Sequence, residues 1–381
     1  MKALIIFGLI SFFSGSVFAE VIDSKVPVNA IFDTDMCIDP DDGMALAIVH
    51  ALHDRHEANL VAVTIGLDEK WCAPYTDILN TFYGHPDIPI GTIRNGLGLK
   101  EATEKIRKGM GWPQPKQKKT VDSFAEFILK RKYPDDSPVY PRHLIDGTQA
   151  PEAVSLLRQT LISQPDESVV MIQVGNSANF AALLAGRPDA ISDLSGFDLI
   201  KKKVRFLSLM GGTFQDVKSP GGDIRLPKGS GINIFEYVSS AGKIFSEWPT
   251  PIVASGTEIG EAIRIPGSSI EHDFSYVTNH PIAESYRYVC TITQQTYDPT
   301  IKCPHDHHTA DPTATLYALR PDRNYFSLSK PGKITVLANG NVRFDEHPDG
   351  KHYHLIIDEE QKIRAQEAMT MLLSQPPVQG R

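Results

Sequence analysis

Two kinds of hydrophobic pattern alternate along the chain. Short apolar runs, several of them rich in β-branched residues, occur at residues 28–32, 59–65, 88–90, 168–174, 204–210 and 251–255. Between them, apolar residues recur at helical spacing over residues 43–52, 75–83, 150–161, 179–185 and 232–245. This alternation predicts an α/β fold with a mostly parallel, Rossmann-like mixed sheet flanked by helices. In such sheets, ligands bind at the carboxyl ends of the strands.

Two segments depart from this alternation. Residues 95–119 are rich in Gly, Pro and Lys and predict a long loop, whose basic residues form a solvated face or a lid over a pocket. Residues 333–356 read as strands joined by turns at Asn339-Gly340 and at residues 348–350, which predicts a small C-terminal β-hairpin appendage. A helix at about 358–373 follows. With neither an internal repeat nor a linker visible, residues 20–381 are expected to form a single domain.

The N-terminal segment has the pattern of a secretory signal peptide. Lys2 precedes an apolar run over residues 3–13, and small residues lead to Ala19. The apolar run is too short to anchor the chain in a bilayer. The sequence therefore predicts cleavage after Ala19, removal of residues 1–19, and an exported protein, periplasmic or secreted, without membrane attachment.

Composition narrows the classes of partner. The chain of 381 residues is 41% hydrophobic, which is enough for a large core, and it carries 38 basic against 46 acidic residues for a net charge of −8. This mildly acidic balance argues against nucleic acid as the main partner.

Four cysteines remain in the exported chain, at positions 37, 72, 290 and 303. An oxidising compartment permits disulfides, and four cysteines allow three pairings. The favoured local pairing is Cys290–Cys303, which leaves Cys37–Cys72 to tie two loops together. Buried free thiols are an equally good alternative.

The most informative segment is acidic. An apolar strand ends in Asp33 and Asp35, and five carboxylates fall within the ten residues from position 33 to position 42, directly before a helix. Crowded like charges are costly unless a cation compensates them. Hard carboxylate oxygens suit Ca²⁺ or Mg²⁺.

Simpler interpretations explain part of this cluster. Asp39 can act as a helix N-cap ahead of Pro40, and acids in the first helical turn gain from the helix dipole. A cap does not account for Asp35, which ends a strand. An EF-hand is excluded because Gly43 comes too late and an apolar helix follows. An aspartyl-phosphate phosphatase is disfavoured because Cys37 stands where that family usually has Thr or Val.

At this point the sequence resembles the inosine–uridine-preferring nucleoside hydrolase family. That family opens with a strand, D-x-D, a short loop and D-D before an apolar helix, as residues 28–43 do here. The loop is longer by Asp39-Pro40, as in exported bacterial relatives. Further blocks follow in the family's order over residues 28–328, namely DIPIG at 87–91, GNSAN at 175–179, MGG at 210–212, GINI at 231–234 and DPTA at 311–314.

The resemblance implies a nucleoside hydrolase fold that binds one Ca²⁺ and a small nucleoside substrate, in a family whose members often form homo-oligomers. It implies Ca²⁺-dependent hydrolysis of the N-glycosidic bond of a ribonucleoside, releasing base and ribose without a covalent intermediate. Carried over by position, the metal ligands are Asp35, Asp42, Asp311 and the backbone carbonyl of Ala178. Asp35 also becomes the general base, Asp41 and Asn233 bind ribose, and Asp33 orients the cluster from behind.

Two departures from the family pattern bear on the substrate contacts. Gly231 stands where the family has a ribose-binding Glu, and Glu258 is a candidate substitute. Ala310 stands where some members have a His that protonates the leaving base. His305, His307 and His308 lie just upstream and are candidates for this acid, although a polar loop is the simpler interpretation.

These departures leave two questions open. The base-binding loops match no substrate-defined member; Trp71 or Trp112 could stack on a nucleobase or simply pack against the core. An alternative to the hydrolase is a non-catalytic, metal-containing protein that binds a nucleoside or a sugar. Gly231 and Ala310 favour this alternative, whereas the complete set of acids favours the enzyme.

Overall fold

The computed structural model describes residues 26–111, 122–218, 225–226, 228–296 and 299–378. The expected signal peptide and Trp112 lie outside these residues.

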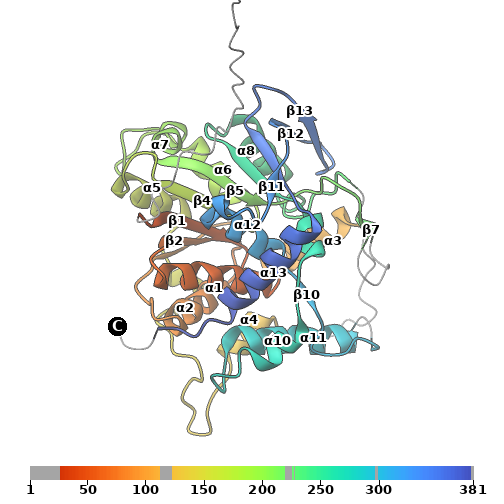
Figure 1. The fold of residues 1–381 in the computed structure, drawn as a ribbon. Helices are drawn as coiled ribbons and strands as arrows, with labels where there is room; N and C mark the ends of the chain where they lie inside the picture. Colours follow the sequence, from red (N-terminus) through yellow and green to blue (C-terminus); the bar gives the residue numbers. More distant parts are fainter. Residues whose placement is uncertain (1–25, 112–121, 219–224, 227, 297–298, 379–381) are drawn as a thin grey trace, which may run out of the picture.

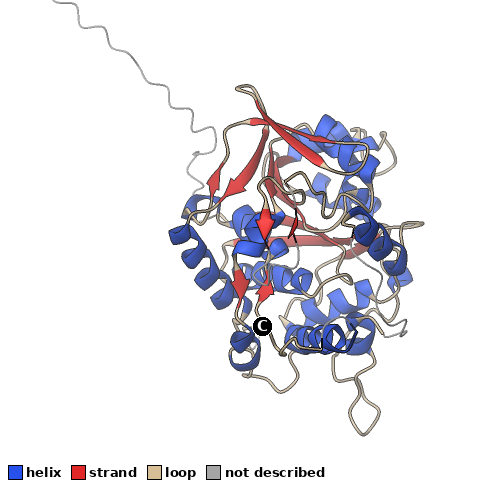
Figure 2. Cartoon of the chain, turned by 90° about the vertical axis from the view of Figure 1, so that its right-hand side faces the viewer, coloured by secondary structure: helices blue, strands red, loops and turns tan. Residues whose placement is uncertain are grey.

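The core of the fold is a ten-stranded mixed sheet (Figures 1 and 2). Its strand order is β13-β12-β14-β8-β5-β4-β1-β2-β3, with β11 paired to β14. All neighbours from β14 to β3 run parallel. The strands are β1 (Val28–Thr34), β2 (Ala58–Ile65), β3 (Ile90–Thr92), β4 (Val169–Gln173), β5 (Val204–Met210), β8 (Ile252–Ser255), β11 (Ser327–Leu328), β12 (Gly332–Val336), β13 (Val342–Glu346) and β14 (His352–Ile356).

Helices cover both faces of this sheet. One face packs on α1 (Asp41–Asp54), α12 (Ala310–Leu319) and α13 (Glu359–Leu373), with α2 (Cys72–Phe82), α4 (Phe124–Leu129) and α11 (Pro281–Thr296) beyond them. The other face packs on α5 (Ala153–Ser163), α6 (Ala178–Ala185), α7 (Gly196–Lys203) and α8 (Val238–Glu247). Successive β1 residues serve opposite faces, since Ile31 belongs to the second core and Phe32 to the first. The predicted α/β class is confirmed.

The remaining elements are short and lie outside the main sheet. They are α3 (Leu99–Gly109), α9 (Thr257–Ala262), α10 (Gly267–His272), the 3₁₀ turns η1 (Gly147–Gln149) and η2 (Pro321–Arg323), and two small strand pairs, β6 (Val217–Lys218) with β7 (Arg225–Leu226) and β9 (Arg264–Ile265) with β10 (His307–His308).

The order of the strands creates a switch point beside β1. The chain builds outward from β1 through β2 to β3 and then returns to the other side of β1 for β4, β5 and β8. Loops leaving β1 and β4 therefore separate in opposite directions, which opens a crevice at their carboxyl ends. The acidic segment leaves β1 at this crevice.

Two sequence predictions of local structure were wrong. Residues 95–119 were predicted to be a loop, but they contain α3. Flanking Gly and Pro obscured a run of strong helix formers in which Ala102 and Ile106 share a buried side. The helix predicted at 232–245 begins only at Val238, and residues 232–237 form turns in which Asn233 has a φ of 60°.

The predicted C-terminal hairpin is present as β12 and β13, which pair antiparallel from Gly332 with Glu346 to Val336 with Val342. It is not separate from the main fold, because β14 pairs parallel with β8 and joins the hairpin to the central sheet. Figure 1 shows this hairpin beside α8. The C-terminal strands thus extend the sheet at the edge opposite β3.

Both favoured disulfides are present. Cys37 is bonded to Cys72, and Cys290 is bonded to Cys303, so the alternative of free thiols is wrong. The first bond fixes the acidic loop after β1 to the start of α2. Among the described residues, the structure contains no helix of the length and hydrophobicity that crossing a membrane requires.

Candidate active site

A cavity of about 340 Å³ lies at the carboxyl ends of the central strands. One end is acidic and contains the side chains of Asp35, Asp41, Asp42 and Asp311. The lining also includes the apolar side chains of Ile38, Ile106, Met210 and Ile232. Helix α3 contributes Ile106, so the segment predicted to be a loop helps to enclose the cavity. A polar molecule with one flat, less polar part would match this mixed lining.

The backbone places the acids by simple local means. After β1 the chain turns, and the amides of Cys37 and Ile38 donate to the carbonyl of Asp35. Helix α1 then starts at Asp41, so Asp41 and Asp42 lie in its first turn. Asp311 comes from the first turn of α12, which packs against α1. Carboxylate oxygens of Asp41, Asp42 and Asp311 lie within 4.8 Å of one another.

A close backbone approach behind Asp35 requires glycine at position 175. A Cβ atom built on Gly175 would lie 2.4 Å from the backbone nitrogen of Asp35, a distance that no real contact allows. The loop after β4 can therefore pass directly beside the loop after β1. This contact brings the GNSAN segment to the acidic cluster.

Burial makes the ionisation of this cluster expensive. Asp35, Asp41, Asp42 and Asp311 are between 1% and 5% exposed. Burial, with the charges of neighbouring carboxylates, raises the pKa of Asp35 to about 7 and that of Asp41 to about 8. For the same reasons the pKa values of Asp42 and Asp311 lie well above the usual range for aspartate. A bound cation would offset this cost.

The donor set matches a hard divalent cation. The grouped ligand atoms of Asp41, Asp42 and Asp311 are all carboxylate oxygens, which Ca²⁺ and Mg²⁺ prefer. Of the described residues that line the cavity, only Arg264 and His308 are basic, and Arg264 pairs with Glu261. The four buried acids are thus largely uncompensated by protein charges. The residues present could hold a metal ion at this end of the cavity.

Asp33 lies behind the cluster rather than in the cavity. Its carboxylate accepts hydrogen bonds from the Thr64 hydroxyl at 2.5 Å and from the Asn179 amide at 2.8 Å. Burial nevertheless raises its pKa to about 7. Asp33 thereby connects the ends of β1 and β2 to α6.

Asp39 lies one residue before the cap position of α1, which Pro40 occupies. Its carboxylate still accepts a hydrogen bond at 3.3 Å from the backbone amide of Asp41, the first residue of the helix. Asp39 also pairs with His307 Nε2 at 2.9 Å and with His308 Nε2 at 3.6 Å. Although burial opposes its ionisation, these two histidines hold the pKa of Asp39 well below its usual range.

The three candidate histidines occupy different environments. His308 lines the cavity, and its Nε2 lies 4.0 Å from Asp41. Burial lowers the pKa of His308, but Asp39 outweighs this effect and raises it to about 9. His307 is behind it against Asp39, and His305 contacts the sulfur of Cys290. Of the three, only His308 lines the cavity.

Sequence reasoning missed Glu236. This residue is 1% exposed, and its carboxyl is close enough to Asp35 for the two charges to interact. The Asn176 amide donates to it at 3.4 Å, and Lys105 binds its backbone carbonyl at 3.1 Å. Burial and the charge of Asp35 raise its pKa well above the usual range. The only sequence signal was a Glu five residues after Gly231, which the wrongly extended helix concealed.

The other expected site residues are distributed as follows. Asn233 lines the cavity, and its amide donates to the carbonyl of Val174. Glu258 does not line the cavity, because its carboxylate accepts from the amide of Phe214 at 3.1 Å. Ala178 begins α6 and is not among the lining residues. Trp71 packs against the core beneath Lys70.

The C-terminal hairpin explains the glycine at position 231. A Cβ atom on Gly231 would lie 2.0 Å from the carbonyl oxygen of Gly340, in the turn between β12 and β13. A glutamate, which the family resemblance would place at this position, has no room here. The hairpin therefore supports the segment that bears Asn233 and Glu236.

This contact predicts a large stability difference between two glycine substitutions. Gly231→Ala should lower the free energy of unfolding by about 1–3 kcal/mol, since the backbone must shift to relieve the overlap. Gly242→Ala is the control, because nothing lies within 4 Å of its Cβ position on α8, and it should raise stability by about 0.4–1 kcal/mol. Denaturant unfolding measures both, and equal stabilities would refute the packing argument.

The fold and the cavity together define the class of protein. It is a doubly wound α/β protein with an acidic small-molecule site at its switch point. The sequence model of the inosine-uridine preferring nucleoside hydrolases matches residues 30–371. The chain belongs to this family, whose members hydrolyse N-glycosyl bonds of nucleosides. The family and the fold are thus those of N-glycosyl hydrolases.

Solved structures show the same fold at low sequence identity. A plant nucleoside hydrolase, PpNRh1, is 19% identical with a TM-score of 0.62, over 92% of this chain and 100% of that one. A purine-preferring ribonucleoside hydrolase from Gardnerella vaginalis is 15% identical with a TM-score of 0.61, over 91% and 98%. The inosine-uridine preferring nucleoside hydrolase of Bacillus anthracis is 15% identical with a TM-score of 0.60, over 91% and 99%. No curated protein sequence gives a significant match.

Proposed function

We propose that the protein is a Ca²⁺-dependent nucleoside hydrolase that cleaves a ribonucleoside into free base and ribose. The observation that carries this proposal is the group of four buried carboxylates that share one cavity with apolar side chains. Such carboxylates stabilise the positive charge that develops on ribose as the glycosidic bond breaks.

In the proposed reaction, Asp35 is the general base. Its side chain lines the cavity, and the raised pKa brings it near 7, where a carboxylate accepts a proton more readily. Ca²⁺, held by Asp35, Asp42 and Asp311, would position the attacking water and lower its pKa. The water oxygen bonds to the anomeric carbon, its proton passes to Asp35, and the glycosidic electron pair leaves with the base.

Ribose recognition is assigned to Asp41, Asn233 and Glu236. The first two line the cavity, and Glu236 reaches Asp35 from the segment that follows Gly231. We therefore assign to Glu236 the contact that relatives make from the position of Gly231. Glu258 is not assigned this role, because its carboxylate accepts a hydrogen bond from the Phe214 amide.

The departing base must gain a proton, and His308 is the proposed donor. It lies in the cavity wall beside Asp39, whose charge favours the protonated imidazolium. His307 supports Asp39 from behind and does not line the cavity. His308 thus donates the proton, and His307 positions Asp39.

His308→Ala should lower kcat for natural nucleosides by about two orders of magnitude, as is typical for loss of a general acid. A riboside with a 4-nitrophenolate leaving group needs no proton, so its hydrolysis should be nearly unchanged. His305→Ala, which alters a residue outside the cavity, is the matched control and should leave both rates close to wild type. Equal losses on both substrates would reject the acid role.

We also propose that residues 20–381 form one domain that acts outside the cytoplasm, in the periplasm or as a secreted protein. The two disulfides support an oxidising location. N-terminal sequencing of the protein from its native host should give a mature chain that begins at Glu20. A chain beginning at Met1 would contradict this proposal.

A panel of nucleosides tests the proposed activity. Inosine, adenosine, guanosine, uridine and cytidine are incubated with the protein, and free ribose is measured. Ribose release should stop with a chelator and return with added Ca²⁺. Release that persists in excess chelator would remove the metal requirement from the proposal.

The second candidate function is a metal-containing binder of a nucleoside or sugar without turnover. Gly231 and Ala310, which replace side chains that contact substrate in relatives, favour it. One structural neighbour is an effector protein, XopQ, solved with adenosine diphosphate ribose, at 14% identity and a TM-score of 0.62, over 93% of this chain and 95% of that one. Saturable nucleoside binding without ribose release from any nucleoside would establish this function instead.

A further inference from the structure

Two aspartates and two histidines form a second group of possible metal ligands beside the acidic cluster. The members of this group are Asp39, Asp41, His307 and His308. One ligand atom from each residue, a carboxylate oxygen or an imidazole nitrogen, lies within 4.8 Å of the other three. Asp41 also belongs to the group that it forms with Asp42 and Asp311, so the two groups are adjacent.

The donor atoms of the two groups differ in kind. Asp41, Asp42 and Asp311 offer only oxygen, whereas the second group adds two imidazole nitrogens. Imidazole nitrogen suits zinc and similar transition metals, while Ca²⁺ and Mg²⁺ prefer oxygen. Two nitrogens and two oxygens supply the four ligands of a tetrahedral zinc site, and two carboxylates balance the charge of the ion. The second group therefore matches Zn²⁺ rather than Ca²⁺.

The spacing of the four side chains is close to that of a tetrahedral zinc site. Zinc bonds of about 2.0–2.1 Å place neighbouring ligand atoms roughly 3.3 Å apart. His307 Nε2 lies 2.9 Å from an oxygen of Asp39, and His308 Nε2 lies 3.6 Å from the other. His308 Nε2 lies 4.0 Å from Asp41. Because these distances fall on both sides of the tetrahedral value, small side-chain rotations would close the group around an ion.

An ion can reach this group through the acidic cavity. Asp39, Asp41 and His308 line the cavity, and His307 contacts Asp39 from behind. The charge of Arg264, which also lines the cavity, is offset by Glu261. An entering ion therefore meets two carboxylates, and a proton carried on Nε2 of either histidine passes to solvent as the ion binds.

Disulfides anchor both halves of the group. The bond between Cys37 and Cys72 fixes the loop that carries Asp39 to the start of α2. The bond between Cys290 and Cys303 ties the segment that leads into β10, which carries both histidines, to α11. The carboxylates and the imidazoles are thus attached to two different helices.

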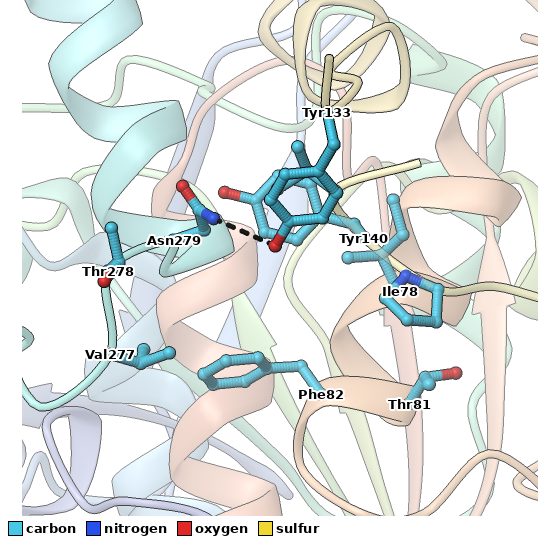
Figure 3. Close-up of a pocket in the computed structure, with 10 residues that line it drawn as sticks. Ile78, Thr81, Phe82, Tyr133, Tyr140, Val277, Thr278 and Asn279 are labelled. Atoms are coloured by element: carbon cyan, nitrogen blue, oxygen red, sulfur yellow. Dashed lines mark hydrogen bonds between the residues drawn. The ribbon is translucent and has the colours of Figure 1, made fainter. Parts of the chain in front are cut away.

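These two helices are joined to each other. The hydroxyls of Tyr75 on α2 and Ser285 on α11 share a hydrogen bond of 2.9 Å. The ring of Phe82 on α2 packs edge-on against His280, with centroids 4.6 Å apart, and Figure 3 shows it extending toward Val277 in the segment before α11. The ligands are therefore held on one connected frame, which lowers the entropy cost of binding an ion.

We propose that Asp39, Asp41, His307 and His308 bind one Zn²⁺ ion, at a site distinct from the proposed Ca²⁺ site, and that this ion inhibits nucleoside hydrolysis. The inhibition rests on the proposed function. Zn²⁺ on His308 Nε2 leaves no proton there for the departing base, and Zn²⁺ on Asp41 occupies a carboxylate assigned to ribose. The binding itself requires no turnover.

Calorimetric titration of Zn²⁺ into the disulfide-bonded protein, with Ca²⁺ in millimolar excess, tests binding without substrate. His307→Gln keeps a donor for Asp39 but offers no imidazole nitrogen. It should weaken Zn²⁺ binding by about tenfold or more, since even partners outside the ligand shell contribute that much. His308→Gln should show a similar loss. His305→Ala, which alters a residue that contacts Cys290 outside the group, is the matched control and should bind like wild type.

Co²⁺ reports the geometry of the site, because its visible absorption is much stronger with four ligands than with six. The strong absorption should appear with wild type, disappear when Zn²⁺ is added, and be absent from His307→Gln, with circular dichroism confirming that each variant is folded. The site is overturned if folded wild type binds Zn²⁺ no more tightly than both glutamine variants. It is equally overturned if bound Co²⁺ shows only the weak six-ligand spectrum.

The inhibitory role is tested on whichever nucleoside the protein cleaves. With Ca²⁺ in excess, Zn²⁺ should abolish ribose release, and His307→Gln should need about tenfold more Zn²⁺ for the same fractional loss of its own rate. Zn²⁺ binding that leaves hydrolysis unchanged would refute the inhibitory role. If no nucleoside is cleaved, the proposed function fails, while the titrations still decide whether the zinc site exists.

Discussion

Replacing Asp35 with asparagine is expected to lower kcat by roughly two to four orders of magnitude, with a much smaller effect on substrate binding. Asparagine keeps the size of the side chain and one oxygen ligand but cannot accept a proton from water. Asp35 lines the acidic cavity at the end of β1 and is 4% exposed, so no solvent-borne base can readily replace it.

The metal content of the Asp35→Asn protein must be measured beside its rate. Elemental analysis at saturating Ca²⁺ separates loss of the base from loss of the ion. Asp87→Asn, in an exposed turn, is the matched control and should retain full activity. Near-wild-type turnover by Asp35→Asn with metal bound would show that the base lies elsewhere.

The second large effect is on the folding stability of Asp42→Asn relative to wild type, and its sign differs with and without metal. Asp42 is 1% exposed, accepts a hydrogen bond from the Thr34 hydroxyl, and has Asp41 and Asp311 close by. In excess chelator, Asp42→Asn should be at least as stable as wild type because it removes one of several crowded like charges. With Ca²⁺ at 100 times its wild-type Kd, wild type should gain about 2.7 kcal/mol and the variant far less.

Thermal unfolding with and without Ca²⁺ measures this reversal in the order of stability of wild type and Asp42→Asn. Asp349→Asn, in the exposed turn before β14, is the control and should respond to Ca²⁺ as wild type does. If Asp42→Asn gains as much stability from Ca²⁺ as wild type, then Asp42 is not a ligand.

Much of the fold is encoded locally. Buried strands such as β1 and β5 appear in the sequence as apolar runs because both of their faces are covered by helices. Errors arose where two local signals competed. Flanking Gly and Pro concealed α3, and the apolar residues around Ile232 and Phe235 imitated a helix although they form turns.

The acidic end of the site was also visible in the sequence. Asp35, Asp41 and Asp42 are separated by only a few residues, so a strand end followed at once by a helix start must keep them close. Asp311 required the ordered blocks of the family resemblance, because nothing local relates it to residues far earlier in the chain.

The sequence by itself determined the α/β class and the acidic cluster, because these depend on periodicity and adjacency. It favoured the two disulfide pairs but left free thiols as an equal alternative, which the structure excluded. Only the tertiary structure decided that Asp39 binds His307, 268 residues away, and that Glu236 reaches Asp35. It alone showed that Gly231 makes room for the hairpin turn at Gly340. These contacts form where loops from distant strands meet at one edge of the sheet, and strand order, which local pattern does not specify, determines which loops meet there.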